Sequence, residues 1–203
     1  FISHLHGDHC FGLLGLISTL NLLGRTAELH IHSPQGLEEL MKPMLDFFNR
    51  QMTYAVVFHA FDTREPSVVY EDRSLTVTTI PLRHRMPTCG FLFAEKPSPR
   101  HIVREMVDFY EVPVYELNRI KNGADYVTPD GEVIANERLT RPSDPPRSYA
   151  YCSDTLPLAS VVEQVRGADL LFHEATFVEE DAPRAKETFH TCLLYTSPSP
   201  RDS

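Results

Sequence analysis

Four metal-ligand side chains lie within six residues near the start of the chain. The hexapeptide His-Leu-His-Gly-Asp-His begins at His4 and offers His4, His6, Asp8 and His9. In an extended segment alternate side chains share a face, so His4 and His6 can bind one ion together. Gly7 permits a sharp bend, after which Asp8 and His9 can face a second ion. Imidazole nitrogens with a carboxylate are typical zinc ligands, so the loop predicts a metal site; the alternative is a polar histidine loop without an ion.

The bulk composition is that of a globular protein. The chain has 203 residues, 42% of them hydrophobic, which suffices for one domain with a sizeable core. No apolar run approaches the ~20 residues of a membrane-spanning helix. The four cysteines form no Cys-x-x-Cys pair, which favours a reducing compartment over a disulfide framework. A net charge of −9 argues against the broadly basic surface that a nucleic-acid partner usually requires.

Both ends of the sequence lead us to expect a fragment. The chain begins with Phe rather than Met, at what reads as the end of a buried strand over residues 1–3, so we expect the true N-terminus to be missing. Residues 192–203 follow no helical or strand pattern and resemble the translation of a sequencing adapter. We therefore set them apart from the fold as a non-native tail. The alternative is a genuine disordered tail rich in Ser and Pro.

The spacing of apolar residues predicts the secondary structure of the remaining chain. Helices are expected over residues 11–23, 34–50 and 158–167. Strands are expected over residues 28–32, 54–60, 67–70, 75–80, 89–94, 148–152 and 169–172. Because strands and helices interleave, and polar clusters follow the strands, the pattern indicates a layered α/β sandwich.

The segment 95–147 has a different composition. It holds seven of the sixteen prolines, together with eight basic and ten acidic residues. Short helical stretches are expected over residues 100–110 and 114–121, and a hairpin-like turn over 128–131. We interpret this segment as an arm inserted into the domain rather than as part of its core.

Further ligand-type residues stand where strands are expected to end. His84, Asp154 and the pair His173–Glu174 each follow a predicted strand, and His190 lies near the end of the informative sequence. Loops at strand ends are where a rigid scaffold presents functional groups. Singly, each has a structural alternative: an exposed loop histidine, a helix N-cap, or a buried polar pair. Together with the first loop they form a full ligand set for two ions, and Asp154 can bridge both.

The other histidines are interpreted as structural. His30 and His32 repeat the His-x-His spacing, but no Asp-His follows and the chain turns away. His59 lies in an apolar strand and His101 in the arm, both without expected ligand-type neighbours. Cys10 adjoins the metal loop and is expected to be a buried thiol rather than a ligand.

The motifs, taken in order, resemble one known family. The sequence Phe-Ile-Ser-His-Leu-His-Gly-Asp-His over residues 1–9 resembles the metal loop of the metallo-β-lactamase superfamily. Ser-Asp-Thr at 153–155, His-Glu-Ala-Thr at 173–176 and His-Thr at 190–191 then resemble ribonuclease Z motifs, and the likeness covers residues 1–191. It implies an αββα sandwich, incomplete at both ends, with an inserted arm at about 95–147.

The resemblance also implies a role for each matching residue. One zinc ion would be bound by His4, His6 and His84, and the second by Asp8 and His9, with Asp154 between them. His190 would act as general acid, oriented by Glu174, and Asp8 would also hold a proton of the attacking water. The family's second zinc takes a later histidine, beyond this chain. At position 191 Thr stands where the family usually has Ser.

The function implied by the resemblance is zinc-dependent removal of the 3′ trailer from precursor tRNA, leaving a 3′-hydroxyl on the tRNA. It further implies two zinc ions per complete subunit, a cytoplasmic location, a homodimer and no membrane association. Candidate RNA contacts in the arm are Lys96, Arg100, Arg104, Arg119 and Lys121. Two alternatives stay open: another hydrolase of the same fold, acting on a phosphodiester or thioester, or an inactive fragment. We expect the 203 residues alone to be inactive.

Overall fold

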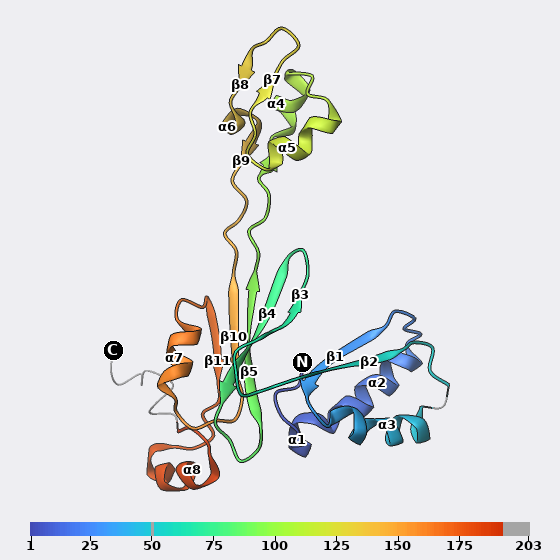
Figure 1. The fold of residues 1–203 in the computed structure, drawn as a ribbon, viewed down its shortest axis with the longest axis vertical. Coiled ribbons are helices and arrows are strands. Elements are labelled where there is room, and N and C mark those ends of the chain that lie inside the picture. Colours follow the sequence, from blue (N-terminus) through green and yellow to red (C-terminus); the bar gives the residue numbers. More distant parts are fainter. Residues whose placement is uncertain (50, 193–203) are drawn as a thin grey trace. The chain divides into compact units, whose positions relative to one another are not determined.

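The computed structural model describes residues 1–49 and 51–192, and Figure 1 shows its elements. The chain divides into two compact units, one formed by residues 1–94 with the chain from Ser148 onward, the other by Glu95–Arg147. The second unit has the bounds of the proline-rich segment; its interpretation as an inserted arm stays a prediction. Of the tail set apart above, residues 193–203 lie outside the described residues, whereas Cys192 is buried and forms an isolated bridge with Phe177.

The first unit begins with a helical layer on a small sheet. Strands β1 (Leu29–Pro34) and β2 (Val56–Phe61) are parallel, and helices α2 (Gly12–Leu22) and α3 (Leu37–Phe48) lie along one side of them (Figure 1). Ile17, Ile31 and Met41 form the core between these layers. The helix expected over 34–50 starts later, because Gly36 has a left-handed conformation (φ 100°) that residues other than glycine rarely adopt.

The expected strand over residues 1–3 is not formed. The segment is extended and joins two sheets instead: Ile2 N donates to His32 O on β1, and Ser3 O accepts from Cys89 N on the larger sheet. Phe1 stacks on His32 and contacts Phe91. These single bonds to two different neighbours replace the ladder that a strand would need.

The larger sheet has five strands in the order β11-β10-β5-β4-β3. Their bounds are Val68–Glu71 (β3), Leu75–Leu82 (β4), Thr88–Glu95 (β5), Ser148–Cys152 (β10) and Leu170–His173 (β11). Strand β3 is antiparallel to β4 and β5 to β10, while β10 and β11 are parallel and connected through helix α7 (Ala159–Val165). The strand expected over 148–152 has these bounds in the structure.

Alternating side chains give this sheet two apolar faces. Ile80, Ala150 and Cys152 pack against Val161 of α7. The opposite face, with Val77, Cys89 and Phe91, packs against Phe61 at the end of β2. The unit is therefore layered helix–sheet–sheet–helix; the interleaved pattern predicted a layered α/β sandwich, and the family resemblance implied this order of layers.

The chain ends its described part with two elements that the apolar spacing did not predict. These are a 3₁₀ turn η2 (Glu179–Asp181) and helix α8 (Ala182–Thr188). Only Ala185 of α8 is buried, so the helix carries no apolar stripe that the sequence could reveal.

The second unit has a core of its own. Its elements are β6 (His101–Ile102), α4 (Arg104–Phe109), η1 (Val114–Glu116), α5 (Leu117–Lys121), β7 (Tyr126–Val127), β8 (Val133–Ile134), α6 (Asn136–Leu139) and β9 (Thr140–Arg141). Val107, Ile120 and Leu139 lie in the apolar centre. The buried Asn136 amide donates to Ile120 O and Ala124 O, and so joins the end of α5 to the loop that follows it.

The four cysteines are free and buried. Burial raises the pKa of Cys89 to about 12 and that of Cys152 to about 11, so both thiols stay protonated at neutral pH. Among the described residues, no helix combines the length and the apolar character that crossing a bilayer would require.

Gly90 on β5 is expected to be the least replaceable glycine of the sheet. A Cβ at this position would overlap the backbone carbonyl oxygen of Tyr151, which cannot move without breaking strand pairing. We expect Gly90→Ala to lower the free energy of unfolding by about 3 kcal/mol or more, measured by urea unfolding. Gly15→Ala is the control, because its site on α2 is open and a helical alanine should add about 0.5–1 kcal/mol. Equal effects of the two changes would contradict the packing described here.

Candidate metal centre

Four of the residues singled out from the sequence form one compact group. His4 and His6 precede the helical turn α1 (Gly7–Cys10), His84 follows β4, and Asp154 follows β10. One ligand atom from each lies within 4.8 Å of every other. His6 Nδ1 is 3.1 Å from His4 Nε2 and 3.2 Å from His84 Nε2, and Asp154 Oδ2 lies 3.7–3.8 Å from the same two Nε2 atoms.

Hydrogen bonds on the far side of two rings show which nitrogens carry lone pairs. His84 Nδ1 donates to the carbonyl oxygen of Phe189 at 2.9 Å, since a carbonyl can only accept. Ser3 Oγ donates to Ser153 Oγ, so it accepts from His4 Nδ1 at 3.1 Å. The Nε2 atoms of His4 and His84 are therefore unprotonated, and their lone pairs face His6 Nδ1. His6 Nδ1 has at most one proton to share between them.

This arrangement fits a cation. At least two nitrogen lone pairs and a carboxylate oxygen face one another at 3.1–3.8 Å without enough protons to separate them. A divalent ion such as zinc, which accepts neutral imidazole and carboxylate, would convert this repulsion into binding. Imidazoles held through their other nitrogen by a carbonyl or hydroxyl are the usual second-layer arrangement of such sites.

Burial keeps the imidazoles in the form that binds metal. His4 is fully buried, and desolvation, followed by the neighbouring imidazoles, lowers its pKa to about 3. Desolvation also lowers the pKa of His84. Both rings are therefore neutral at pH 7, as metal ligation requires.

Asp8 and His9 lie beside this group on the turn α1. The chain is extended at His6 and changes direction at Gly7, where the helical turn begins, so the expected bend lies at Gly7. His9 Nε2 is 3.3 Å from Asp154 Oδ2 and 3.4 Å from Asp8 Oδ2, while the Asp8 side chain is 79% exposed. Asp154 thus lies between the group of His4, His6 and His84 and the Asp8–His9 pair, as a bridging carboxylate would.

The pair of His190 and Glu174 also lies near Asp154. His190 Nε2 is 3.9 Å from Asp154 Oδ2, and His190 Nδ1 is 3.2 Å from Glu174 Oε1. Because the carboxylate accepts the Nδ1 proton, Nε2 is the atom that can carry a mobile proton toward the centre. Glu174 is buried and also accepts from three backbone N–H groups, those of Thr155, Thr176 and Thr191.

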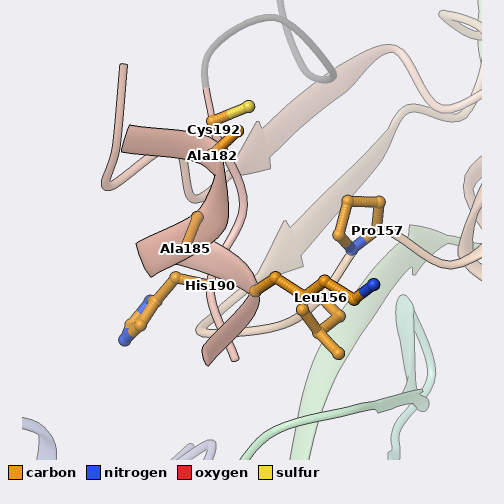
Figure 2. A pocket seen from close by; sticks show the side chains of 7 residues that line it. Leu156, Pro157, Ala182, Ala185, His190 and Cys192 are labelled. Atoms are coloured by element: carbon orange, nitrogen blue, oxygen red, sulfur yellow. The ribbon is translucent and has the colours of Figure 1, made fainter. Parts of the chain in front are cut away.

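The end of α8 directs His190. Phe189 adopts a left-handed conformation (φ 61°), which ends the helix, and His190 N donates to Ala185 O at 2.8 Å. A cavity of about 360 Å³ lies beside this turn, lined by Leu156, Pro157, Ala182, Ala185, Lys186, His190 and Cys192. Figure 2 shows that the His190 imidazole is directed away from Leu156 and Pro157.

Sequence reasoning assigned no role to the hydroxyl groups around the centre. Ser3 and Ser153 orient His4, and Thr176 Oγ1 donates to Glu174 Oε2 at 2.8 Å. Thr191 Oγ1 donates to Thr155 O at 2.7 Å, a bond that serine could make equally, so the departure at position 191 retains the necessary group. The only sign of these roles in the sequence is that each hydroxyl residue lies in or directly beside a ligand motif.

The remaining sequence candidates lie outside the group. His173 Nδ1 bonds to the carbonyl oxygen of Glu174. The expectation that His59 lacks ligand-type neighbours is wrong, because its Nε2 is 2.9 Å from His30 Nδ1 and its ring stacks on His32. His30 bonds through its opposite nitrogens to His59 and toward Glu28, so these side chains do not converge on one point.

The arm candidates Lys96, Arg100, Arg104, Arg119 and Lys121 belong to the second unit. Several of them have partners within this unit. Arg104 pairs with Asp108, Arg119 with Glu116, and Arg100 donates to Thr140. RNA contact through these side chains stays a prediction.

The chain is similar to known proteins in both sequence and fold. No protein-family model matches the sequence. A curated Bacteroides fragilis (strain YCH46) protein named ribonuclease Z is 76% identical over 191 residues, which are 94% of this chain and 63% of that protein. A Bacteroides thetaiotaomicron protein of the same name is 71% identical, again over 94% of this chain, and 60% of its length is covered. The chain thus spans about 60–63% of these relatives.

Among solved structures, human tRNase Z, short form, matches with a TM-score of 0.64 at 22% identity, covering 96% of this chain and 64% of the human one. This likeness shows the fold and confirms the predicted metallo-β-lactamase class.

Proposed function

Because the chain belongs to the ribonuclease Z family, we propose that it forms part of a metal-dependent endoribonuclease that removes the 3′ trailer from precursor tRNA. The observation that carries the proposal is the convergence of His4, His6, His84 and Asp154 on one point, with the His190–Glu174 pair alongside. The proposed activity belongs to a protein of the relatives' full length.

The proposed cofactor is a pair of zinc ions per complete subunit. His4, His6 and His84 would hold one, Asp8 and His9 would help to hold the other, and Asp154 would lie between them. When bound, such ions supply a nucleophilic water near neutral pH and neutralise charge on the phosphate. They would also offset the carboxylates of a chain whose net charge is −9.

Asp8 and His190 would each handle one of the two proton transfers. Asp8, exposed at the mouth of the centre, would hold a proton of the attacking water. As water attacks phosphorus, the bond to the 3′ oxygen breaks, and His190 Nε2–H would donate its proton to that oxygen. His190 would carry a proton on each ring nitrogen before this transfer, with Nδ1–H accepted by Glu174, and would be left as the neutral Nδ1–H tautomer after it. The products would be a tRNA with a 3′-hydroxyl and a trailer with a 5′-phosphate.

The tRNA contacts, the oligomeric state and the cellular location are also proposed from the family relationship. We infer that residues 95–147 contact the tRNA, with Lys96, Arg100, Arg104, Arg119 and Lys121 as candidate phosphate contacts. Arg104 and Arg119 would exchange their carboxylate partners for phosphate, at a cost that lowers each contribution. The complete protein is proposed to be a cytoplasmic homodimer.

The 203 residues alone are proposed to be inactive. Within the described part of the chain the β1–β2 sheet has two strands, and a two-stranded sheet is marginal without further pairing. Leu22 and Leu23 at the end of α2 are 86% and 77% exposed, and Leu170 on the edge strand β11 is 63% exposed. Exposed apolar side chains of this kind are usually covered by further polypeptide in a complete protein.

The test is a full-length chimera in which this chain replaces the aligned segment of the Bacteroides fragilis relative. Incubated with a precursor tRNA, it should cut once, leaving a 3′-hydroxyl and a 5′-phosphate, and a chelator should abolish cleavage until zinc is restored. A thioester and a generic phosphodiester serve as comparison substrates. Hydrolysis of either one without cleavage of the precursor would overturn the proposal in favour of another hydrolase of this fold.

A further inference from the structure

We propose that Thr155 is a positioning residue that holds the metal ligands and the His190–Glu174 pair in a fixed mutual arrangement; this rests on the function proposed above. Thr155 directly follows Asp154 and has no solvent exposure. Its backbone N–H, its backbone carbonyl and its hydroxyl each bond to a different loop of the centre.

The hydroxyl of Thr155 fixes the loop that carries His84. Thr155 Oγ1 accepts from Arg83 N at 3.1 Å and donates to Leu156 O at 2.8 Å. Leu156 N in turn donates to Arg83 O at 2.9 Å. Arg83 is therefore bonded at both its backbone groups, and His84, the next residue, cannot shift away from Asp154 without breaking these bonds.

The backbone of Thr155 fixes the other two loops. Thr155 N donates to Glu174 Oε1 at 3.1 Å, and Thr155 O accepts from Thr191 Oγ1 at 2.7 Å. Thr191 N donates to the same Glu174 oxygen at 2.8 Å, which closes the network. Thr191 directly follows His190. The loop of the proton donor and the orienting carboxylate Glu174 are therefore both bonded to Thr155, the residue after Asp154.

Through this network Thr155 affects both the loop that carries the ligand His84 and the loop that carries the proton donor His190. Metal ligands and catalytic side chains must stay within about 0.5 Å of their productive positions, and buried hydrogen bonds to neighbouring backbone provide that rigidity. Loss of the Thr155 hydroxyl leaves the Arg83 N–H without its acceptor and loosens the loop that carries His84. Loss of the Thr191 hydroxyl frees the His190 loop but leaves the ligands in place.

The first experiment measures metal affinity in this chain. Thr155→Val keeps the shape and removes the hydroxyl, and Thr155→Ser restores it. We expect zinc affinity, measured by chelator competition, to fall about 10–100-fold in the valine variant, the range typical for lost outer-layer partners, and to recover in the serine variant. The cobalt-substituted absorption spectrum should change in the same pattern.

Thr79→Val is the matched control, because Thr79 is also fully buried and its hydroxyl also accepts from a backbone N–H, that of Ser67. It should lower stability without changing zinc affinity. Equal zinc affinity in wild type and Thr155→Val would overturn the proposal, as would an equal loss in Thr79→Val.

The second experiment applies even where Thr155→Val does not fold. In the chimera, Thr191→Val should lower kcat for precursor tRNA at least 10-fold with KM and zinc content unchanged, and Thr191→Ser should behave as wild type. An unchanged kcat would overturn the proposal. Absence of cleavage by the unsubstituted chimera would instead count against the proposed function, while the zinc affinities still decide the role of Thr155.

Discussion

Asp154→Asn is expected to lower zinc affinity at least 100-fold, the upper end of what loss of an outer-layer partner costs. Asp154 Oδ2 lies within 3.3–3.9 Å of the Nε2 atoms of four histidines, at positions 4, 9, 84 and 190. The amide has nearly the same shape but carries no charge, so the imidazoles would face two cations with Asp8 as the nearby carboxylate. Zinc content after dialysis, measured by mass spectrometry, gives the result.

The control for this change is Asp62→Asn. Asp62 is an exposed carboxylate that pairs with Arg64, two residues away, and touches none of the proposed ligands. Its substitution should leave zinc binding as in the wild type. Retention of two zinc ions by Asp154→Asn would show that the carboxylate does not bridge them, and the assignment of the centre would then be wrong.

His190→Gln is expected to lower kcat for precursor tRNA by about 100- to 10,000-fold, the usual contribution of a positioned general acid. The zinc content should not change, because the structure places His190 at 3.9 Å from Asp154 on the side of Glu174, outside the compact ligand group. The assay uses the full-length chimera with precursor tRNA, and zinc is measured on the same samples.

The leaving group supplies the sharper discrimination for this prediction. A bis-p-nitrophenyl phosphate releases a stable phenolate that needs no proton, so its hydrolysis should fall less than about 3-fold in His190→Gln. Equal losses on both substrates would show that His190 binds or supports the site rather than donating a proton. Glu174→Gln is less informative, because its amide would place a donor against the backbone N–H groups that the carboxylate now accepts.

Sequence reasoning identified the residues of the centre where strong local patterns carry them. The His-x-His spacing and the ends of well-defined strands indicated His4, His6, His84 and Asp154, and the structure brings these four together. Their binding of zinc stays a prediction. The strand over 148–152 was predictable because its two tyrosines favour the extended conformation, and in the structure it pairs with a strand on each side.

Features that depend on distant parts of the chain could not be predicted. The bond between Ser3 and Ser153 spans 150 residues and leaves no local pattern. Helix α8 is short and polar, and it is ended by a left-handed Phe189 that propensity disfavours. The expected helix over 100–110 is shortened because His101 and Ile102 pair with Arg141 and Thr140, forty residues away. The bend at Gly7 was predicted, but the sequence did not show that Phe11 N would bond back to Gly7 O and make the bend a helical turn.

The pairing of β5 with β10 has a consequence for how such a chain can diversify. Ala94 lies opposite Ser148 in an antiparallel register, and Glu95 N still bonds to Arg147 O just beyond them. The 53 residues between these positions therefore leave and re-enter the sheet at adjacent points, as a hairpin loop does. The closure entropy of a loop grows only slowly with its length, so evolution can lengthen, shorten or exchange this module while the first unit keeps its strand alignment.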